Sequence, residues 1–455
     1  MHSDPARHHH VRTLATIGAG LALALATTAT AFAAPRPAFA PETRLGFPGG
    51  DDWEPAIAAD RLGHVYVLWS HYVDYAGLGA GDIDPTCPTC GTPHSDLQIS
   101  NDNGATFGAP FAPWPTDTRQ DDPQIVVDPV DGTTVYAAFM EGNKSSEYVA
   151  RSTDFGVHWR KVLVEPLRRG TDKDILAVRG ANIYLLYHTQ QKAYVSFSHD
   201  AGGTWETVDM FGGTGQIGVS FASGGAVASD GTVYFALNGV EQAGQAKGNV
   251  NLYVARSRDG GETWTASIVD VSDAAPRCDC VGYDYWGAQM ALDVDDADNV
   301  YVLWDANRVK YGPQRMYFAR STDGRHWSTP VDVSRAPTGS NNLFPAIVGG
   351  AAGDVRIAWT DDRNGFDAGS FDPNARWNVY YRSSADGGTT WSDEAKLSSF
   401  VAGYSYKLAT PRDGFLQPYG DYFELDINAI GRTVAIWGEG NSYVGPGNIW
   451  FARQP

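Results

Sequence analysis

From residue 43 to the C-terminus, apolar and polar residues alternate along short segments with the period of two that is typical of β-strands. The basic unit is an apolar segment, a tight turn and an aromatic-rich segment, as in 55–60 followed by 64–69. Six further copies follow: 123–128 with 134–139, 175–179 with 183–187, Val227 with 233–237, 290–294 with 300–304, 345–348 with 355–359, and 423–428 with 433–437. A unit of this size that recurs seven times predicts an all-β repeat architecture.

A second motif, Ser-x-Asp-x-Gly-x-Thr-Trp, accompanies these units and has the chemistry of a turn. The Asp side chain can accept hydrogen bonds from the backbone of the turn that it opens, and Gly supplies a positive φ. Three copies are complete, two are close, and one is a residue short. We expect all six aspartates to be structural: Asp102, Asp154, Asp200, Asp259, Asp323 and Asp386.

The ends of the chain explain why seven units accompany only six motifs. Segment 449–453 matches the strand that normally precedes a motif, and the chain stops there. Segment 43–47 could supply the missing outer strand and close a ring. The sequence therefore predicts a seven-bladed β-propeller in one domain, 34–455, closed by 43–47 pairing with a C-terminal blade at 419–455. A six-bladed propeller is the alternative, because the third unit is short.

Together these motifs resemble the sialidase-like Asp-box (BNR repeat) β-propeller proteins, from about residue 43 to the C-terminus. Two stretches, Trp359–Asn364 and Tyr419–Tyr422, resemble secreted bacterial members described as exo-sialidase-like. The resemblance implies a propeller and, in established sialidases, six blades. The Asp box also occurs in other hydrolases, in lyases and in binding proteins, so it predicts the fold more firmly than the activity.

The longest loops are predicted at the strand ends opposite the Asp boxes. They are 72–95, 238–251, 305–315, 360–378, 399–420 and 438–448. Binding sites concentrate on such loops, so we expect the functional face there.

Carboxylates gather where these loops enter the first strand of each unit. They are Asp51, Asp52, Glu54, Asp121, Asp122, Asp172, Asp174, Asp284 and Asp421. Crowded carboxyls suit general acid–base catalysis or a structural calcium ion. We expect Asp122 or Asp52 to be the acid/base, with Asp421 or Tyr419 as its partner, and no cofactor to be required.

Arginines on the same loops could bind a carboxylated sugar through their planar guanidinium groups. They are Arg119, Arg168, Arg169, Arg277, Arg308, Arg315, Arg363, Arg376 and Arg412. The resemblance implies three substrate-binding arginines, the first in a Phe-Arg-Ile-Pro motif, but this chain has Asp52-Trp53-Glu54-Pro55 at that place. This departure argues against standard sialidase chemistry.

The substrate-binding candidates are Arg119, Arg308, Arg363, Arg412 and Tyr404. The resemblance also implies a tyrosine nucleophile late in the chain, for which Tyr419 and Tyr404 are the candidates. Each arginine could instead be a residue that tethers a loop.

The N-terminus and the cysteines both indicate an exported protein. Residues 1–33 combine Arg7 and Arg12, an apolar segment at 14–32 and a small-residue site at 31–33, which predicts a signal peptide. The four cysteines form two close pairs, Cys87 with Cys90 and Cys278 with Cys280. We expect disulfides that join the two loops; bridges within each pair and a four-thiolate metal site are the alternatives.

The net charge of −19 argues against binding to nucleic acids or to anionic membrane surfaces. No later stretch is long and apolar enough to cross a membrane. The leading hypothesis is a secreted, monomeric, exo-acting glycoside hydrolase whose partner is a carbohydrate or glycoconjugate. A polysaccharide lyase and a non-catalytic propeller that binds glycan or protein are the alternatives.

Overall fold

The computed structural model contains seven antiparallel sheets formed by residues between 34 and 455. The structure describes residues 36–47, 51–73, 86–165, 170–189, 192–212, 219–240, 249–273, 288–363, 377–399, 422–440 and 447–455. Among these residues every regular element is a strand, and there is no helix that could span a membrane.

Each sheet is one blade, and the blades are numbered here in chain order. Their strands are β2 (Asp51–Ala59), β3 (Val65–Tyr72) and β4 (His94–Ser100) in blade 1; β5 (Gln120–Val127), β6 (Val135–Glu141), β7 (Ser146–Ser152) and β8 (Arg160–Glu165) in blade 2; β9 (Thr171–Arg179), β10 (Asn182–Thr189), β11 (Lys192–Ser198) and β12 (Glu206–Asp209) in blade 3; β13 (Val219–Val227), β14 (Val233–Val240), β15 (Val250–Ser257) and β16 (Thr265–Ser272) in blade 4; β17 (Met290–Val294), β18 (Val300–Ala306), β19 (Arg315–Ser321) and β20 (Val331–Asp332) in blade 5; β21 (Asn342–Gly349), β22 (Val355–Asp361), β23 (Asn378–Ser384) and β24 (Ala395–Lys396) in blade 6; and β25 (Phe423–Ile427), β26 (Thr433–Gly440), β27 (Gly447–Arg453) and β1 (Thr43–Leu45) in blade 7.

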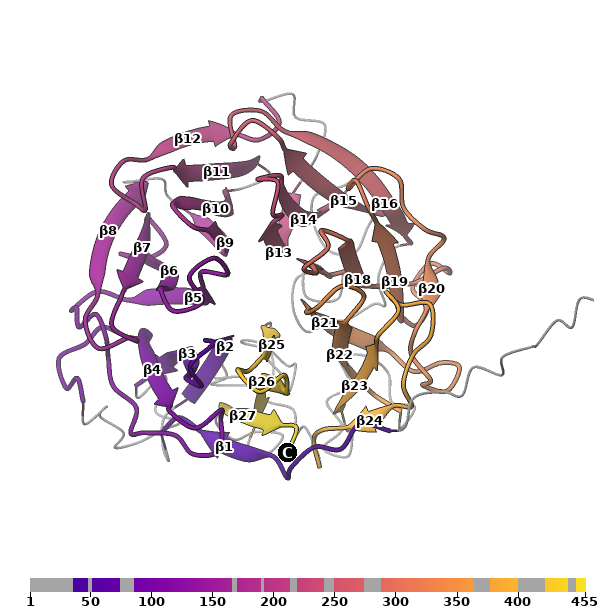
Figure 1. The fold of residues 1–455 in the computed structure, drawn as a ribbon, viewed down its shortest axis with the longest axis horizontal. Helices are drawn as coiled ribbons and strands as arrows, with labels where there is room; N and C mark the ends of the chain where they lie inside the picture. The colour runs from indigo at the N-terminus through magenta and orange to yellow at the C-terminus, as the bar shows by residue number, and fades with distance from the viewer. Residues whose placement is uncertain are drawn as a thin grey trace, which may run out of the picture. The chain divides into compact units, whose positions relative to one another are not determined.

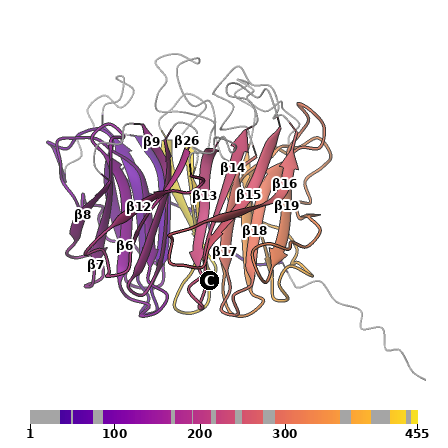
Figure 2. The same ribbon diagram turned by 90° about the horizontal axis from the view of Figure 1, so that it is seen from above.

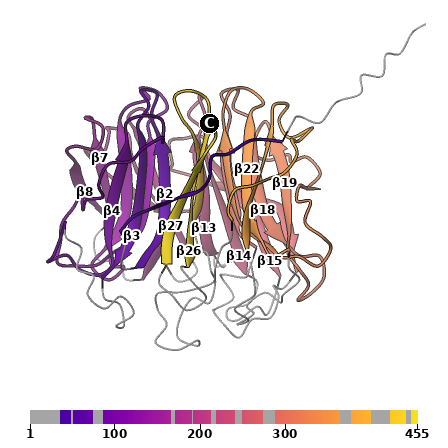
Figure 3. The same ribbon diagram turned by 90° about the horizontal axis from the view of Figure 1, so that it is seen from below.

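The blades stand around a central axis and form a ring, which confirms the prediction of seven blades rather than six (Figure 1). The first strand of each blade lies nearest the axis. Blade 7 combines the two ends of the described chain, because β1 pairs antiparallel with β27 and Thr43 lies opposite Phe451. Seen from the edge, the strands run between two faces of the ring (Figures 2 and 3).

The hydrophobic core consists of the layers between neighbouring blades. Large side chains at equivalent places on the second strands, such as Trp69, Trp304, Trp359 and Trp437, are buried there. Burying a side chain of this size contributes about 2–3 kcal/mol. Carboxylates accept the indole N–H groups of three of these rings: Asp52 accepts that of Trp69 at 2.8 Å, Asp270 that of Trp304 at 2.8 Å and Asp361 that of Trp359 at 3.1 Å, so these three are buried with their donors satisfied.

The Asp boxes form the turns between the third and fourth positions of six blades, all on one face, here called the box face. In the third blade, Asp200 accepts hydrogen bonds from the Ser198 hydroxyl and from the backbone and side chain of Thr204, each at 2.8 Å. The other five boxes repeat these contacts, with His158 and His326 in the place of the threonine in two of them. The carboxylates therefore hold turns, as the motif predicts.

Candidate functional site

The inner strands of five blades contain a β-bulge, which in four of them lies near the start of the strand, close to the opposite face, here called the loop face. The pairing register shifts at each bulge in β2, β5, β9, β13 and β21. The residue at the centre of each bulge has a left-handed backbone: Glu54 (φ 57°), Asp122 (φ 51°), Lys173 (φ 55°), Gly224 (φ 68°) and Phe344 (φ 52°). Left-handed residues other than Gly are strained, and bulges of this kind are common beside functional sites.

These bulges account for the strand starts that the sequence pattern placed too late. The pattern begins three inner strands at Pro55, Pro123 and Pro345, because proline cannot donate a hydrogen bond within a sheet. In the structure each proline follows the left-handed residue of a bulge, and the strand starts three or four residues earlier. The extra residues bring polar side chains to the loop face.

A short turn in blade 2 lies beside the start of blade 3. Three successive residues of this turn, Gly142, Asn143 and Lys144, have positive φ angles of 70°, 63° and 54°. The Lys144 carbonyl accepts hydrogen bonds from the amides of Gly170 and Thr171, at 2.8 and 3.2 Å. The strained turn is therefore fixed to β9, and this places the Lys144 side chain between the two blades.

Lys144 interacts electrostatically with four carboxyl groups, here called the carboxyl cluster: Asp122, Glu147, Asp172 and Asp174. The Lys144 ammonium lies 2.5 Å from Asp172 and 3.7 Å from Asp122. Asp122 also accepts a hydrogen bond from the Lys173 backbone amide at 3.3 Å, which joins blade 2 to blade 3. Two blades thus contribute to one group of charges.

The carboxyl cluster has two layers. The side chains of Lys144 and Asp172 are 32% and 38% exposed and face solvent. Beneath them, Asp122 is 1% exposed, while Glu147 and Asp174 are 0% exposed. A molecule that approaches from the loop face meets the lysine and the aspartate first.

Burial and charge drive the pKa values within the cluster in opposite directions. Burial would raise the pKa of Asp122, but the ammonium groups of Lys144 and Lys173 outweigh it and lower that pKa. Burial raises the pKa of Glu147 to about 8, and the charges of Asp122 and Asp172 add to this increase. Burial, followed by the charges of Glu147 and Asp122, raises the pKa of Asp174 well above its usual value.

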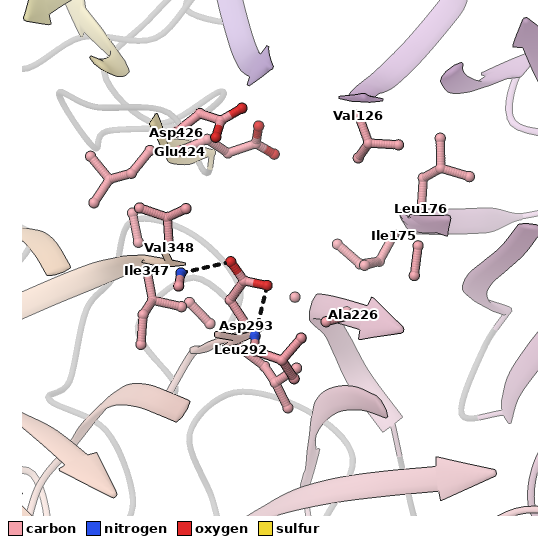
Figure 4. A pocket seen from close by; sticks show the side chains of 18 of the residues that line it. Val126, Ile175, Leu176, Ala226, Leu292, Asp293, Ile347, Val348, Glu424 and Asp426 are labelled. Atoms are coloured by element: carbon pink, nitrogen blue, oxygen red, sulfur yellow. Dashed lines mark hydrogen bonds between the residues drawn. The ribbon is translucent and has the colours of Figure 1, made fainter. Parts of the chain in front are cut away.

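An axial cavity of about 430 Å³ lies inside the ring of inner strands. Its wall has an apolar side, with Val126, Ile175 and Leu176, and an acidic side, with Asp293, Glu424 and Asp426 (Figure 4).

The three carboxyls of the acidic side accept hydrogen bonds from backbone amides on the inner strand of the neighbouring blade. Glu424 accepts the amide of Ile57 at 2.8 Å, Asp426 that of Ala59 at 2.6 Å, and Asp293 that of Gly349 at 2.8 Å. Lys173 reaches across from blade 3, and its ammonium lies 4.3 Å from the ring centre of Tyr422 in blade 7. The three acids therefore have a structural role as edge caps between neighbouring blades.

Two of the predicted catalytic aspartates, Asp122 and Asp52, lie among the described residues, and they have different surroundings. Asp122 lies in the carboxyl cluster. Asp52 instead accepts hydrogen bonds from the Phe47 amide, the Trp69 indole and His71, at 3.0, 2.8 and 2.7 Å. It ties the segment after β1 to blade 1, and its catalytic role stays a prediction.

Three predicted substrate-binding arginines already have carboxylate partners. Arg119 forms two hydrogen bonds with Asp121, Arg308 binds Asp270 and lies over the ring of Tyr317, and Arg363 binds Asp361 and Glu394 and lies over Tyr380. Each arginine thus tethers its own segment. Their role as substrate clamps stays a prediction. The substrate-binding candidates Arg412 and Tyr404 and the catalytic candidates Tyr419 and Asp421 lie outside the described residues, and their roles stay predictions as well.

The cysteine prediction needs a correction. Cys87 forms a disulfide with Cys90, so the expected bridge between the two loops is wrong for this pair. Their Cα atoms are 5.4 Å apart, within the distance that a disulfide spans. Cys278 and Cys280 lie outside the described residues.

The structural calcium ion that the sequence analysis suggested stays a prediction. Within the described ranges no group of three or more His, Cys, Asp or Glu residues could hold a metal ion.

Comparison with protein families identifies the fold. The profile of the BNR repeat-like domain matches residues 55–285, just over half of the chain. The chain belongs to the BNR repeat-like family. Its six Asp boxes and propeller fold agree with the sialidase-like Asp-box propellers, whereas its seven blades differ from the six that the resemblance to established sialidases implies. A search of curated proteins found no match.

Solved structures share the fold with this family member at low sequence identity. A protein of unknown function from Dyadobacter fermentans is 13% identical, with a TM-score of 0.51 over 92% of this chain and 99% of that one. The endosialidase of phage phi92 is 9% identical, with a TM-score of 0.51 over 91% of this chain and 69% of that one. A Hadza microbial sialidase is 15% identical, with a TM-score of 0.45 over 89% and 65%. For the two structures with a TM-score of 0.51, the likeness at these identities extends to the fold alone.

The sequence prediction missed Glu147 and Lys144. Counting back from the box serine, the position of Glu147 holds Ala193, Leu252, Met316 and Val379 in blades 3 to 6, all fully buried. A glutamate at a core position of the repeat was the available signal. Lys144 had no comparable signal, because its role depends on the left-handed turn that carries it.

Proposed function

We propose that this protein is a secreted glycoside hydrolase whose reactive carboxyls are Asp122 and Glu147 on the loop face. The observation that carries the proposal is the position of both carboxyls in one cluster beside Lys144, where charge lowers the pKa of Asp122 and burial raises that of Glu147. Glycoside hydrolysis needs one carboxyl that keeps its proton at neutral pH and another that is ionised. Glu147 suits the acid, because its pKa is raised to about 8, and Asp122 suits the ionised base or nucleophile.

The exposed layer above this pair supports a carbohydrate substrate. Lys144 and Asp172 bind each other, but both are partly exposed. An ammonium has three N–H donors and a carboxylate has several acceptor sites, so each group can also bond to a sugar hydroxyl over the buried carboxyls. A mixture of both signs suits the many hydroxyl groups of a neutral sugar. A carboxylated sugar would require free guanidinium groups, whereas Arg119, Arg308 and Arg363 are already bound to carboxylates.

A non-catalytic glycan-binding propeller is the second candidate, and the near-complete burial of Asp122 and Glu147 favours it. In that case the carboxyl cluster would only join blades 2 and 3. Secretion directed by residues 1–33 is part of the proposal for both candidate functions.

The deciding experiment measures turnover of a panel of aryl glycosides, sialyl-lactose and uronate polysaccharides by the full chain. We expect release of the aryl group from a neutral glycoside, which Asp122→Asn and Glu147→Gln strongly reduce. Asp131→Asn, in a turn on the box face of the same blade, is the matched control and should keep turnover. Saturable glycan binding without product would support the second candidate, and new absorbance from an unsaturated uronate would indicate a lyase.

A further inference from the structure

Glu147 and Asp174 are two fully buried carboxyls that come from neighbouring blades. Glu147 starts the third strand of blade 2, and Asp174 lies on the inner strand of blade 3. Both are 0% exposed, and no described donor makes a well-formed hydrogen bond to any of their four oxygens. Two ionised carboxylates could not remain together in such surroundings, because each would be desolvated and each would repel the other.

We propose that Glu147 and Asp174 share one proton across the boundary between blades 2 and 3, so that the pair carries a single negative charge. An ionised carboxyl can only accept hydrogen bonds, so two carboxyls can bond to each other only when one keeps its proton. Such a pair titrates as a unit. The charge of Glu147 is the largest electrostatic influence on Asp174, which agrees with this pairing.

The charged and polar groups around the pair leave the proton in place. Asp122 and Asp172 disfavour ionisation of Glu147, whereas Lys144 and the Thr171 hydroxyl favour it. Lys144 cannot neutralise the pair as well, because its ammonium already binds Asp172 and lies close to Asp122. The pair therefore retains its proton beside an aspartate that is ionised.

The shared proton itself does not depend on the proposed function, but its use in catalysis does. If Glu147 is the acid, Asp174 is a positioning residue: it keeps the proton on the pair at neutral pH without contacting the substrate. The full burial of Asp174 agrees with a role of this kind.

The test uses the full chain with ¹³C-labelled glutamate and follows the side-chain carbon of Glu147 by NMR during a pH titration without substrate. Glu147→Gln identifies the resonance. In Asp174→Asn, the new amide can donate a hydrogen bond to Glu147, and the carboxyl that competed for the proton is gone. The titration midpoint of the Glu147 carboxyl should therefore fall by at least about one pH unit, which corresponds to a tenfold lower proton affinity. Asp172→Asn is the matched control, since it removes a like charge but not the sharing partner. An unchanged midpoint in Asp174→Asn, or an equal fall in both variants, would overturn the proposal.

A second measurement covers the case in which the single variants do not fold. A carboxyl whose pKa is raised on folding stabilises the protein at low pH, and that stability is lost as the pH rises through the folded pKa. The thermal midpoint of the wild type should therefore fall as the pH rises through about 8, and the Glu147→Gln/Asp174→Asn double variant should lose this fall. Equal slopes would refute the shared proton. Absence of turnover with the titration intact would refute only the proposed function.

Discussion

The Asp boxes and the carboxyl cluster use the same chemical group at opposite ends of the strands, with opposite electrostatic results. Asp200, in a box, accepts four hydrogen bonds, from Ser198, Gly203 and Thr204. These bonds, led by the Thr204 backbone amide, lower its pKa to about 2. Glu147, in the cluster, has no comparable donor, and burial raises its pKa to about 8.

The difference shows that the number of donors and access to water decide what a carboxyl can do. A box aspartate is fixed as an anion and holds a turn, so it has no proton to exchange near neutral pH. The cluster contains an anion, Asp122, beside a carboxyl that still holds a proton. Only the second arrangement is suited to acid–base chemistry. The following predictions test this contrast between the two faces.

The largest effect should come from Asp122→Asn. If the protein is a glycoside hydrolase as proposed, loss of the ionised carboxyl lowers kcat/KM by about a thousandfold. Asp259→Asn, in the fourth-blade box, removes a carboxylate that only holds a turn, so turnover per folded molecule should be unchanged. Aryl-glycoside kinetics, with the folded fraction measured by circular dichroism, would compare them. Equal losses would mean that the contrast between the faces is not functional.

The pH dependence of turnover tests Glu147. Its acid form persists up to its pKa of about 8, so the wild-type rate should fall as the pH rises above that value. Glu147→Gln cannot donate a proton, and we expect about a hundredfold lower kcat without that alkaline limb. A pH–rate profile from pH 5 to 10 measures both. An alkaline limb that persists in Glu147→Gln would assign the acid to another residue.

A third test concerns the packing of the box face. Gly388, in the sixth-blade box, has φ +80°, and a Cβ atom there would lie 2.2 Å from the Phe318 ring in blade 5. Gly388→Ala should lower the free energy of unfolding by about 3 kcal/mol, through strain and overpacking. Gly231→Ala is the control: φ is +86°, but no atom lies within 4 Å, so about 1 kcal/mol is expected. Denaturant unfolding measures both, and equal losses would show that packing against the neighbouring blade is unimportant.

The smallest effect should be the stability cost of Asp259→Asn. One net hydrogen bond is lost in an exposed turn, so the cost should be about 1 kcal/mol or less. The Thr263 side chain and backbone, which bond to the carboxylate, lower the pKa of Asp259. Its stabilising effect is therefore complete above the unfolded pKa and is lost as the pH falls through the folded value. The wild type and Asp259→Asn should converge in thermal midpoint at acidic pH; a constant difference would contradict this account.

The sequence predicted the parts of this fold that depend on residues close together in the chain. An Asp box lies within eight residues, and the hydrogen bonds of its aspartate carboxylate stay inside that segment, so the motif was sufficient to assign a structural role to Asp386. The alternation of the strands and the count of seven units followed from local periodicity. The unit at 449–453, which has no motif after it, distinguished seven blades from six.

The candidate site depended on contacts that no local pattern contains. The bulge at Asp122 is a change of pairing register with β6, and the charge of Glu147 acts on Asp174 only because blades 2 and 3 pack side by side. A pKa depends on burial and on charges contributed by other strands, so the sequence placed carboxyls on the loop face but could not tell which of them would keep a proton. The amino-acid sequence by itself determined the blades and their turns. Only the tertiary structure decided the chemistry between the blades, because desolvation and charge coupling exist only once the blades are packed together.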